Sequence, residues 1–104
     1  MGRRLEPQPA LGRVVRQLRK ERDLTQAEVA RTMDVDPSVI SHLELGHSNP
    51  AWGSVKRLAA ALDVTIADLA AQAEAIERRE AASERRRARP AKRASGSAKS
   101  DQAR

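Results

Sequence analysis

Three polar side chains that lie close together in the chain, Ser38, Ser41 and His42, offer hydrogen-bonding chemistry without the means for catalysis. Ser38 and Ser41 fall on one face of a segment with a helical pattern. Serine is only an average helix former, so two serines on one face indicate hydroxyl groups that bind a partner. No Ser–His–Asp spacing occurs on a credible scaffold for catalysis. His42 and Glu44 point in different directions on a helix, which argues against a metal site. The sequence therefore predicts no enzyme activity, no metal and no cofactor.

The helix that carries these residues is the second of a pair with clearly marked starts. Thr25 can cap a helix that begins at Gln26, and Glu28, three residues after Thr25, completes a capping box. Asp36 can cap the next helix, with Pro37 at its first position, where the missing N–H has no consequence. Only a sharp turn fits between the two helices. Two helices held this close form a helix-turn-helix, whose second helix can enter the major groove of DNA.

Apolar side chains repeat with helical spacing on both sides of this pair. They predict amphipathic helices over about residues 10–22 and 52–62 and a fifth helix from residue 66 onward. The predicted inward positions are Leu11, Val14, Val15 and Leu18 in the first helix, and Trp52, Val55, Leu58, Ala59 and Leu62 in the fourth. The fifth helix should end by Pro90, since proline disfavours the helical conformation in the residue before it. Because no alternation typical of strands persists, the expected fold is an all-α, five-helix bundle.

Positive charge is concentrated toward the C-terminus. The 104-residue chain has a net charge of +6 and no cysteine, which fits one small domain without disulfide bonds. Residues 11–69 contain eight basic and eight acidic side chains, whereas residues 70–104 contain ten basic and five acidic ones. We expect a flexible N-terminus over 1–9, a folded domain over 10–77, and a basic helical extension with a disordered tail over 78–104. The basic part serves either solubility or binding to a polyanion.

The chain shows no signal for a membrane or for secretion. Its longest strongly apolar run is a few residues, whereas a membrane-spanning helix needs about 20. The N-terminus, MGRRLEPQPA, is charged and contains prolines, and it lacks the apolar region of a secretory signal. We therefore expect a cytoplasmic protein that contacts no membrane.

Four sequence elements between Leu11 and Leu69 occur together in a specific order: LRKERDLTQAEVA, VDPSVISHLELG, the dipeptide NP and KRLAAALDV. With these elements the chain resembles the Cro/phage-repressor type of helix-turn-helix domain, also called xenobiotic-response-element-like. Any one element is a weak signal, but all four at these separations are a strong one. The resemblance implies a lambda-repressor-like fold of five helices that binds double-stranded DNA, usually as a homodimer.

The resemblance also implies roles for individual residues. Gln26, at the start of the second helix, is expected to contact a DNA phosphate. The outward positions of the next helix, which would face base edges, are held by Pro37, Ser38, Ser41 and His42. Phosphate contacts from the following loop and helix are expected from His47, Asn49, Lys56 and Arg57. Arg19 and Glu44 correspond to a partly buried ion pair that ties the first helix to the third.

Several positions depart from the family pattern or allow two interpretations. Asp34 stands where the turn usually has glycine, in a conformation that aspartate tolerates better than most residues. The expected recognition face has no arginine or lysine, so it should not make bidentate contacts to guanine. Val39 either reaches a thymine methyl group or packs at the edge of the core. Lys56 and Arg57 either contact phosphates or form an ordinary solvated face, whereas Trp52 is expected in the core.

Together these features predict a sequence-specific transcriptional regulator associated with the nucleoid, most simply a dimeric repressor whose recognition helix enters the major groove. Two alternatives remain at this point. One is an antitoxin or a bridging protein that binds a toxin or another partner chain as well as DNA. The other is a nucleic-acid packager without sequence preference, driven by the basic tail.

Overall fold

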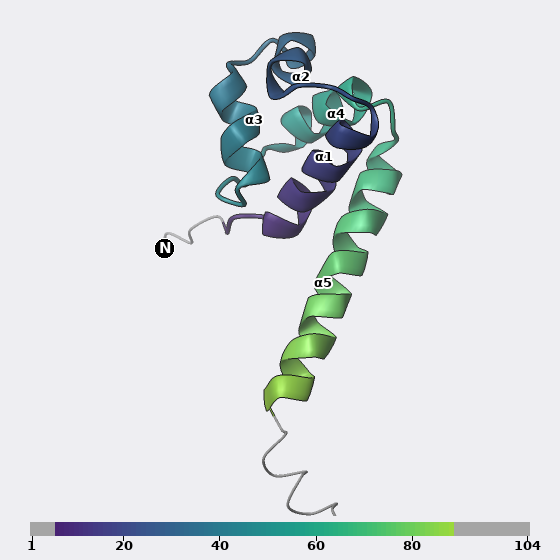
Figure 1. Cartoon of the computed structure of the whole chain (residues 1–104). Coiled ribbons are helices and arrows are strands. Elements are labelled where there is room, and N and C mark those ends of the chain that lie inside the picture. The colour runs from purple at the N-terminus through teal and green to yellow at the C-terminus, as the bar shows by residue number, and fades with distance from the viewer. Residues whose placement is uncertain (1–5, 89–104) are drawn as a thin grey trace, which may run out of the picture.

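The computed structural model describes residues 6–88, which form five helices and no strand. The helices are α1 (Pro9–Glu21), α2 (Gln26–Met33), α3 (Pro37–Glu44), α4 (Trp52–Ala61) and α5 (Ile66–Ala88). The first four gather into a bundle, while α5 runs beside α1 and then projects past it (Figure 1). The all-α, five-helix prediction is confirmed. The predicted disordered tail and residues 1–5 of the predicted flexible N-terminus lie outside the described residues.

Three of the four links between helices are built in the same way. Each contains an aspartate in the left-handed region: φ is 55° at Asp23, 60° at Asp34 and 58° at Asp63. An apolar residue follows and packs against the core, namely Leu24, Val35 and Val64. The next residue caps the new helix by accepting a backbone hydrogen bond, through Thr25, Asp36 and Thr65. Because aspartate tolerates a positive φ, the chain reverses in a few residues without glycine.

The predicted capping box at Thr25 is present, and a second capping box starts α5. The Thr25 hydroxyl accepts a hydrogen bond from the Glu28 N–H at 3.0 Å, and the Glu28 carboxylate accepts one from the Thr25 N–H at 2.8 Å. Thr65 and Asp68 make the same exchange at the start of α5. These local bonds satisfy backbone donors that a helix start would otherwise leave without a partner.

The core lies where α1, α2, α3 and α4 meet the first turn of α5. Its largest fully buried side chains are Val14, Val15, Val29, Ile40, Leu58, Leu62 and Leu69. The predicted inward positions of α1 agree with this core, with Leu11 at its edge. The prediction for Trp52 was wrong, because its side chain is 63% exposed. Trp52 and the buried Leu58 are six positions apart. At 3.6 residues per turn, their side chains point about 120° apart around the helix.

Gly12 brings α1 and α3 into backbone contact. A Cβ atom built on Gly12 would lie far inside van der Waals contact with the carbonyl oxygen of Leu43, and 3.3 Å from the Cα of Glu44. A side chain at this position would therefore push the two helices apart. Glycine thus fixes how closely α3 sits against α1, and with it the position of the outer face of α3.

Candidate nucleic-acid interface

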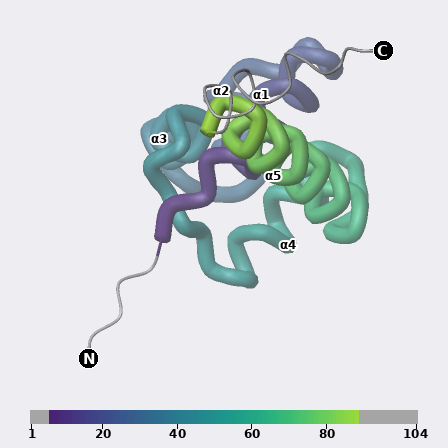
Figure 2. The backbone as a smooth tube through the Cα atoms, turned by 90° about the horizontal axis from the view of Figure 1, so that it is seen from below, coloured from purple at the N-terminus to yellow at the C-terminus, as the bar shows by residue number. Residues whose placement is uncertain are grey.

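The side of α3 that faces away from the core carries the residues expected to read bases. Pro37, Ser38, Val39 and His42 are exposed there and Ser41 is half-buried, and we call these five residues the α3 face. Ile40 and Leu43 fill the opposite side of the helix and are buried. In both Figure 1 and Figure 2, α3 lies on the far side of the bundle from the start of α5. Within the described residues, no other segment covers the α3 face.

Val39 is 45% exposed, although it borders a cavity of about 300 Å³ between α3, the 48–50 loop and α4. Asn49 also lines this cavity, so the structure brings these two predicted contact residues together. His47 is exposed on the same loop. The loop is held to the segment before α1, because the Gln8 N–H donates to the Ser48 carbonyl oxygen at 2.8 Å.

Lys56 and Arg57 are exposed on α4, which packs against α2 and α5. Neither residue lines the cavity that Val39 and Asn49 share. Consecutive helical residues point about 100° apart, so the two side chains face different directions. The structure does not place this pair together with the α3 face, and their contact with phosphates stays a prediction.

Asp36 keeps a negative charge at the start of α3. Hydrogen bonds from the side chain and the backbone N–H of Ser38 hold the pKa of Asp36 below its ordinary value. The backbone bond is 2.9 Å long. The adjacent turn carries a second exposed carboxylate, Asp34. Phosphates are therefore repelled at this end of α3, and favourable phosphate contacts have to come from other parts of the surface.

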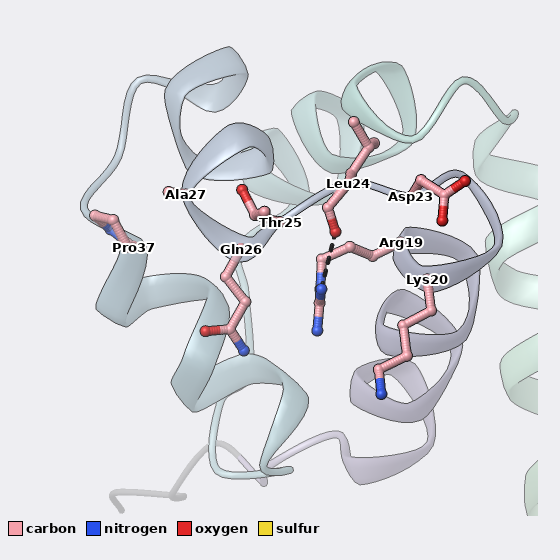
Figure 3. A pocket seen from close by; sticks show the side chains of 8 residues that line it. All are labelled: Arg19, Lys20, Asp23, Leu24, Thr25, Gln26, Ala27 and Pro37. Atoms are coloured by element: carbon pink, nitrogen blue, oxygen red, sulfur yellow. Dashed lines mark hydrogen bonds between the residues drawn. The ribbon is translucent and has the colours of Figure 1, made fainter.

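A buried network joins α1, α2 and α3. The Nε and Nη2 of Arg19 donate to the two carboxylate oxygens of Glu44 at 2.6 and 2.9 Å. The Nη1 of Arg19 donates to the Leu24 carbonyl oxygen at 2.9 Å (Figure 3). The Nε2 of Gln26 donates to Oε1 of Glu44 at 3.0 Å. The side chains of Arg19 and Glu44 are only 11% and 2% exposed, so this charge pair is largely desolvated.

The network keeps Glu44 ionised. Burial raises the pKa of Glu44, but the hydrogen bonds from Arg19 and Gln26 and the positive charges of Arg19 and Arg16 outweigh that effect, and the pKa lies below its ordinary value. The hydrogen bond to Glu44 likewise raises the pKa of Arg19. Both residues therefore stay charged at neutral pH.

This pKa shift makes stability depend on pH. Because the pKa of Glu44 is lower in the folded state, its stabilisation is complete above about pH 4.3, the ordinary glutamate value, and is lost as pH falls through the folded-state pKa. We expect Glu44→Gln to be less stable than the wild type at pH 7 and to lose less stability on acidification. Urea unfolding between pH 7 and 3 measures both curves. If the stability of both proteins fell equally with pH, the low folded-state pKa of Glu44 would be contradicted.

The side chain of Gln26, for which a phosphate contact is expected, also has a partner within the protein. It is half-buried, and one N–H of its side-chain amide is used by Glu44. The amide nitrogen has a second N–H. Gln26 therefore keeps one donor for a phosphate while Glu44 fixes the orientation of its side chain. Sequence reasoning missed this bond, because Gln26 and Glu44 are 18 residues apart.

An open cleft of about 790 Å³ lies beside the network, between α1, α2 and the first residue of α3 (Figure 3). Its lining residues are Arg19, Lys20, Asp23, Leu24, Thr25, Gln26, Ala27 and Pro37. The cleft thus connects Gln26 with the start of the α3 face. Lys20, for which sequence analysis gave no role, lies at its edge.

Within the described residues no helix is long and apolar enough to cross a membrane. In the same part of the chain, no three His, Cys, Asp or Glu side chains are grouped so that they could hold a metal ion.

Comparisons with known proteins agree with this geometry. A helix-turn-helix family model matches residues 15–69, which is more than half of the chain. The clp gene regulator ClgR from Corynebacterium glutamicum has a similar structure, with 28% sequence identity, a TM-score of 0.71, and coverage of 74% of this chain and 82% of that one.

Two further structures match over the helix-turn-helix region. The restriction-modification controller protein C.AhdI from Aeromonas hydrophila is 30% identical with a TM-score of 0.57, and the match covers 59% of this chain and 92% of that one. SinR, a master regulator for biofilm formation whose structure contains DNA, is 30% identical with a TM-score of 0.54, and the match covers 57% and 95% of the two chains. No sequence among the curated proteins matches.

Proposed function

Because the chain belongs to the helix-turn-helix family of the Cro/phage-repressor type, we propose that it is a sequence-specific DNA-binding regulator, a repressor that acts as a homodimer on chromosomal DNA in the cytoplasm. The main supporting observation is the α3 face. It is accessible, carries hydrogen-bonding groups and contains no Lys, Arg, Asp or Glu, and a buried ion pair and a glycine contact hold it rigidly against α1. The similarity to SinR, whose structure contains DNA, supports DNA binding by this chain.

In the proposed complex α3 lies in the major groove. Ser38, Ser41 and His42 hydrogen-bond to base edges, and Val39 and Pro37 make apolar contacts, with Val39 suited to a thymine methyl group. The second N–H of the Gln26 amide donates to a phosphate. Loop and α4 contacts to phosphates come from His47, Asn49 and at least one of Lys56 and Arg57. No bidentate contact to guanine is available from the α3 face, because it has no arginine or lysine.

Dimerisation supplies the specificity that one short helix lacks. A single eight-residue helix touches few base pairs, whereas two copies related by a two-fold axis read two half-sites about 34 Å apart. In this proposal residues 10–77 form the DNA-binding domain and residues 78–104 a basic extension that adds salt-dependent affinity. Because its surface reads DNA and holds no catalytic group, we assign the domain no enzymatic role.

A random-oligonucleotide selection with the full chain tests this proposal. The expected result is enrichment of one motif made of two inverted half-sites. Binding that saturates without enrichment of any motif would instead favour a packager that lacks sequence preference.

The projecting part of α5 favours a second candidate, an antitoxin or bridging protein. α5 has 23 residues and α1 has 13, and the ion pair between Arg13 and Glu80 aligns the two helices so that the last residues of α5 extend past the start of α1. Such an arm suits a partner chain. Co-purification of a 1:1 complex with the product of the neighbouring gene would support this candidate. If no such complex forms, the DNA-binding regulator is the only one of the two candidates that the experiment retains.

A further inference from the structure

Two basic side chains on the outer surface of α1, Arg16 and Lys20, are one helical turn apart and both exposed. Within the described residues neither takes part in an ion pair, unlike Arg13, which pairs with Glu80, and Arg19, which pairs with Glu44. Their charges are therefore not neutralised by a side chain in residues 6–88. We call them the α1 basic pair.

The α1 basic pair lies beside the proposed DNA-binding surface. Lys20 lines the same cleft as Gln26 and Pro37, the first residue of the α3 face. In Figure 3 the Lys20 ammonium, the Arg19 guanidinium and the Gln26 amide all extend to the same side of the cleft. In this view the carboxylate of Asp23, which also lines the cleft, points away from these three groups, and within residues 6–88 it forms no ion pair with Lys20.

Arg16 follows Gly12 by one turn of α1, and Gly12 meets the backbone of Leu43 and Glu44 at the other end of α3. The charge of Arg16 acts on Glu44, the last residue of α3, and contributes to the low pKa of the Glu44 carboxyl. Because Arg16 stands one turn from the contact of Gly12 with the end of α3, and Lys20 borders the cleft at the start of α3, the pair follows the length of the recognition helix. A DNA strand that borders the groove occupied by α3 would pass along the same line.

The charge of the α3 face explains why such a pair is needed. That face has no lysine or arginine, and the start of α3 is flanked by the carboxylates of Asp34 and Asp36. DNA carries one negative charge per roughly 1.7 Å of its axis, so a neutral recognition helix binds only if cations beside it meet the phosphates.

We propose that Arg16 and Lys20 bind adjacent phosphates of the DNA strand that borders the groove occupied by α3. They act as positioning residues: they set the depth and register of α3 and contribute affinity without reading sequence. This inference rests on the proposed function and adds to it a contact surface on α1.

The inference has a specific signature in salt titrations. Each phosphate contact adds about 0.9 to the slope of log affinity against log salt concentration, so Arg16→Gln/Lys20→Gln should reduce the slope by about 2. Its affinity should fall roughly tenfold or more at moderate salt, equally for every duplex. The ratio of affinities for two different sequences should remain unchanged.

The experiment compares this double variant with Arg13→Gln/Arg22→Gln, which removes the same charge from two arginines that pair with Glu80 and Glu21. Two probes are used: the duplex recovered by selection and a mixed-sequence duplex of equal length. The control should keep nearly the wild-type slope, because both of its arginines have a carboxylate partner and neither lines the cleft. Equal changes in slope for the two double variants would overturn the inference, since only net charge would then matter. The inference would also be overturned if Arg16→Gln/Lys20→Gln lowered the ratio of affinities for the two duplexes and left the salt slope unchanged.

Failure of the proposed function is distinguishable from failure of this inference. If the wild type binds both probes equally, the chain is not a sequence-specific regulator. The slope on the mixed-sequence duplex still decides whether Arg16 and Lys20 hold phosphates. Far-ultraviolet circular dichroism verifies that all variants keep their helices.

Discussion

Gly12→Ala is expected to lower the free energy of unfolding by about 3 kcal/mol. The added methyl group would overlap the Leu43 carbonyl oxygen, and backbone atoms cannot move aside as a flexible side chain can. Alanine has a higher helix propensity than glycine by about 1 kcal/mol, which by itself would raise the free energy of unfolding. Helix propensity therefore does not explain the expected loss of stability. To relieve the overlap, α3 has to shift away from α1. The α3 face shifts with it, so DNA affinity should fall together with stability. Urea unfolding measures the first effect and fluorescence anisotropy the second.

Gly53→Ala is the matched control. Its Cβ would meet nothing closer than the Nη1 of Arg57 at 4.0 Å. Because Gly53 lies in the first turn of α4, alanine there should leave stability unchanged or raise it by about 0.5 kcal/mol. If both alanine variants behaved alike, the backbone contact between α1 and α3 would not determine the packing.

Arg19→Ala should also destabilise the fold by about 3 kcal/mol, which is a large part of the 5–15 kcal/mol typical of small domains. The loss arises because Glu44, whose side chain is 2% exposed, would keep its charge with only Gln26 to bond to it. The carbonyl oxygen of Leu24 would lose its Arg19 donor as well. Thermal and urea unfolding measure the change.

Two variants separate this effect from a general loss of charge. Arg13→Ala removes an ion pair whose side chains are 54% and 46% exposed, and surface pairs contribute only about 0–1 kcal/mol. Arg19→Met/Glu44→Leu replaces both charges by apolar groups and should recover much of the stability that Arg19→Ala loses. A loss in Arg19→Ala no larger than in Arg13→Ala would disprove the structural role of the buried pair.

Features with a local cause could be predicted from the sequence. The capping boxes at Thr25 and Thr65 depend on residues three positions apart, so they are visible in the sequence itself. The buried stripe of α1 follows from its apolar spacing. The left-handed turn at Asp34 was expected from the position of that residue in the family pattern.

Features that depend on distant parts of the chain could not be predicted in the same way. The importance of Gly12 depends on the backbone of Leu43, which is 31 residues away. Trp52 was assigned to the core because it is large and apolar, but the position of a first-turn residue depends on how α4 docks. The hydrogen bond from Gln26 to Glu44 and the place of Lys20 at the cleft likewise require the helices to be assembled.

The central claim is that the α3 face reads DNA sequence, and the ratio of affinities for a selected and a mixed-sequence duplex tests it most directly. The wild type should prefer the selected duplex by about 10³ or more. Ser38→Ala/Ser41→Ala/His42→Ala should reduce that ratio at least roughly tenfold, since each lost base contact is worth about 1–3 kcal/mol. Helicity and affinity for the mixed-sequence duplex should stay nearly constant. An unchanged ratio in this triple variant would contradict the account.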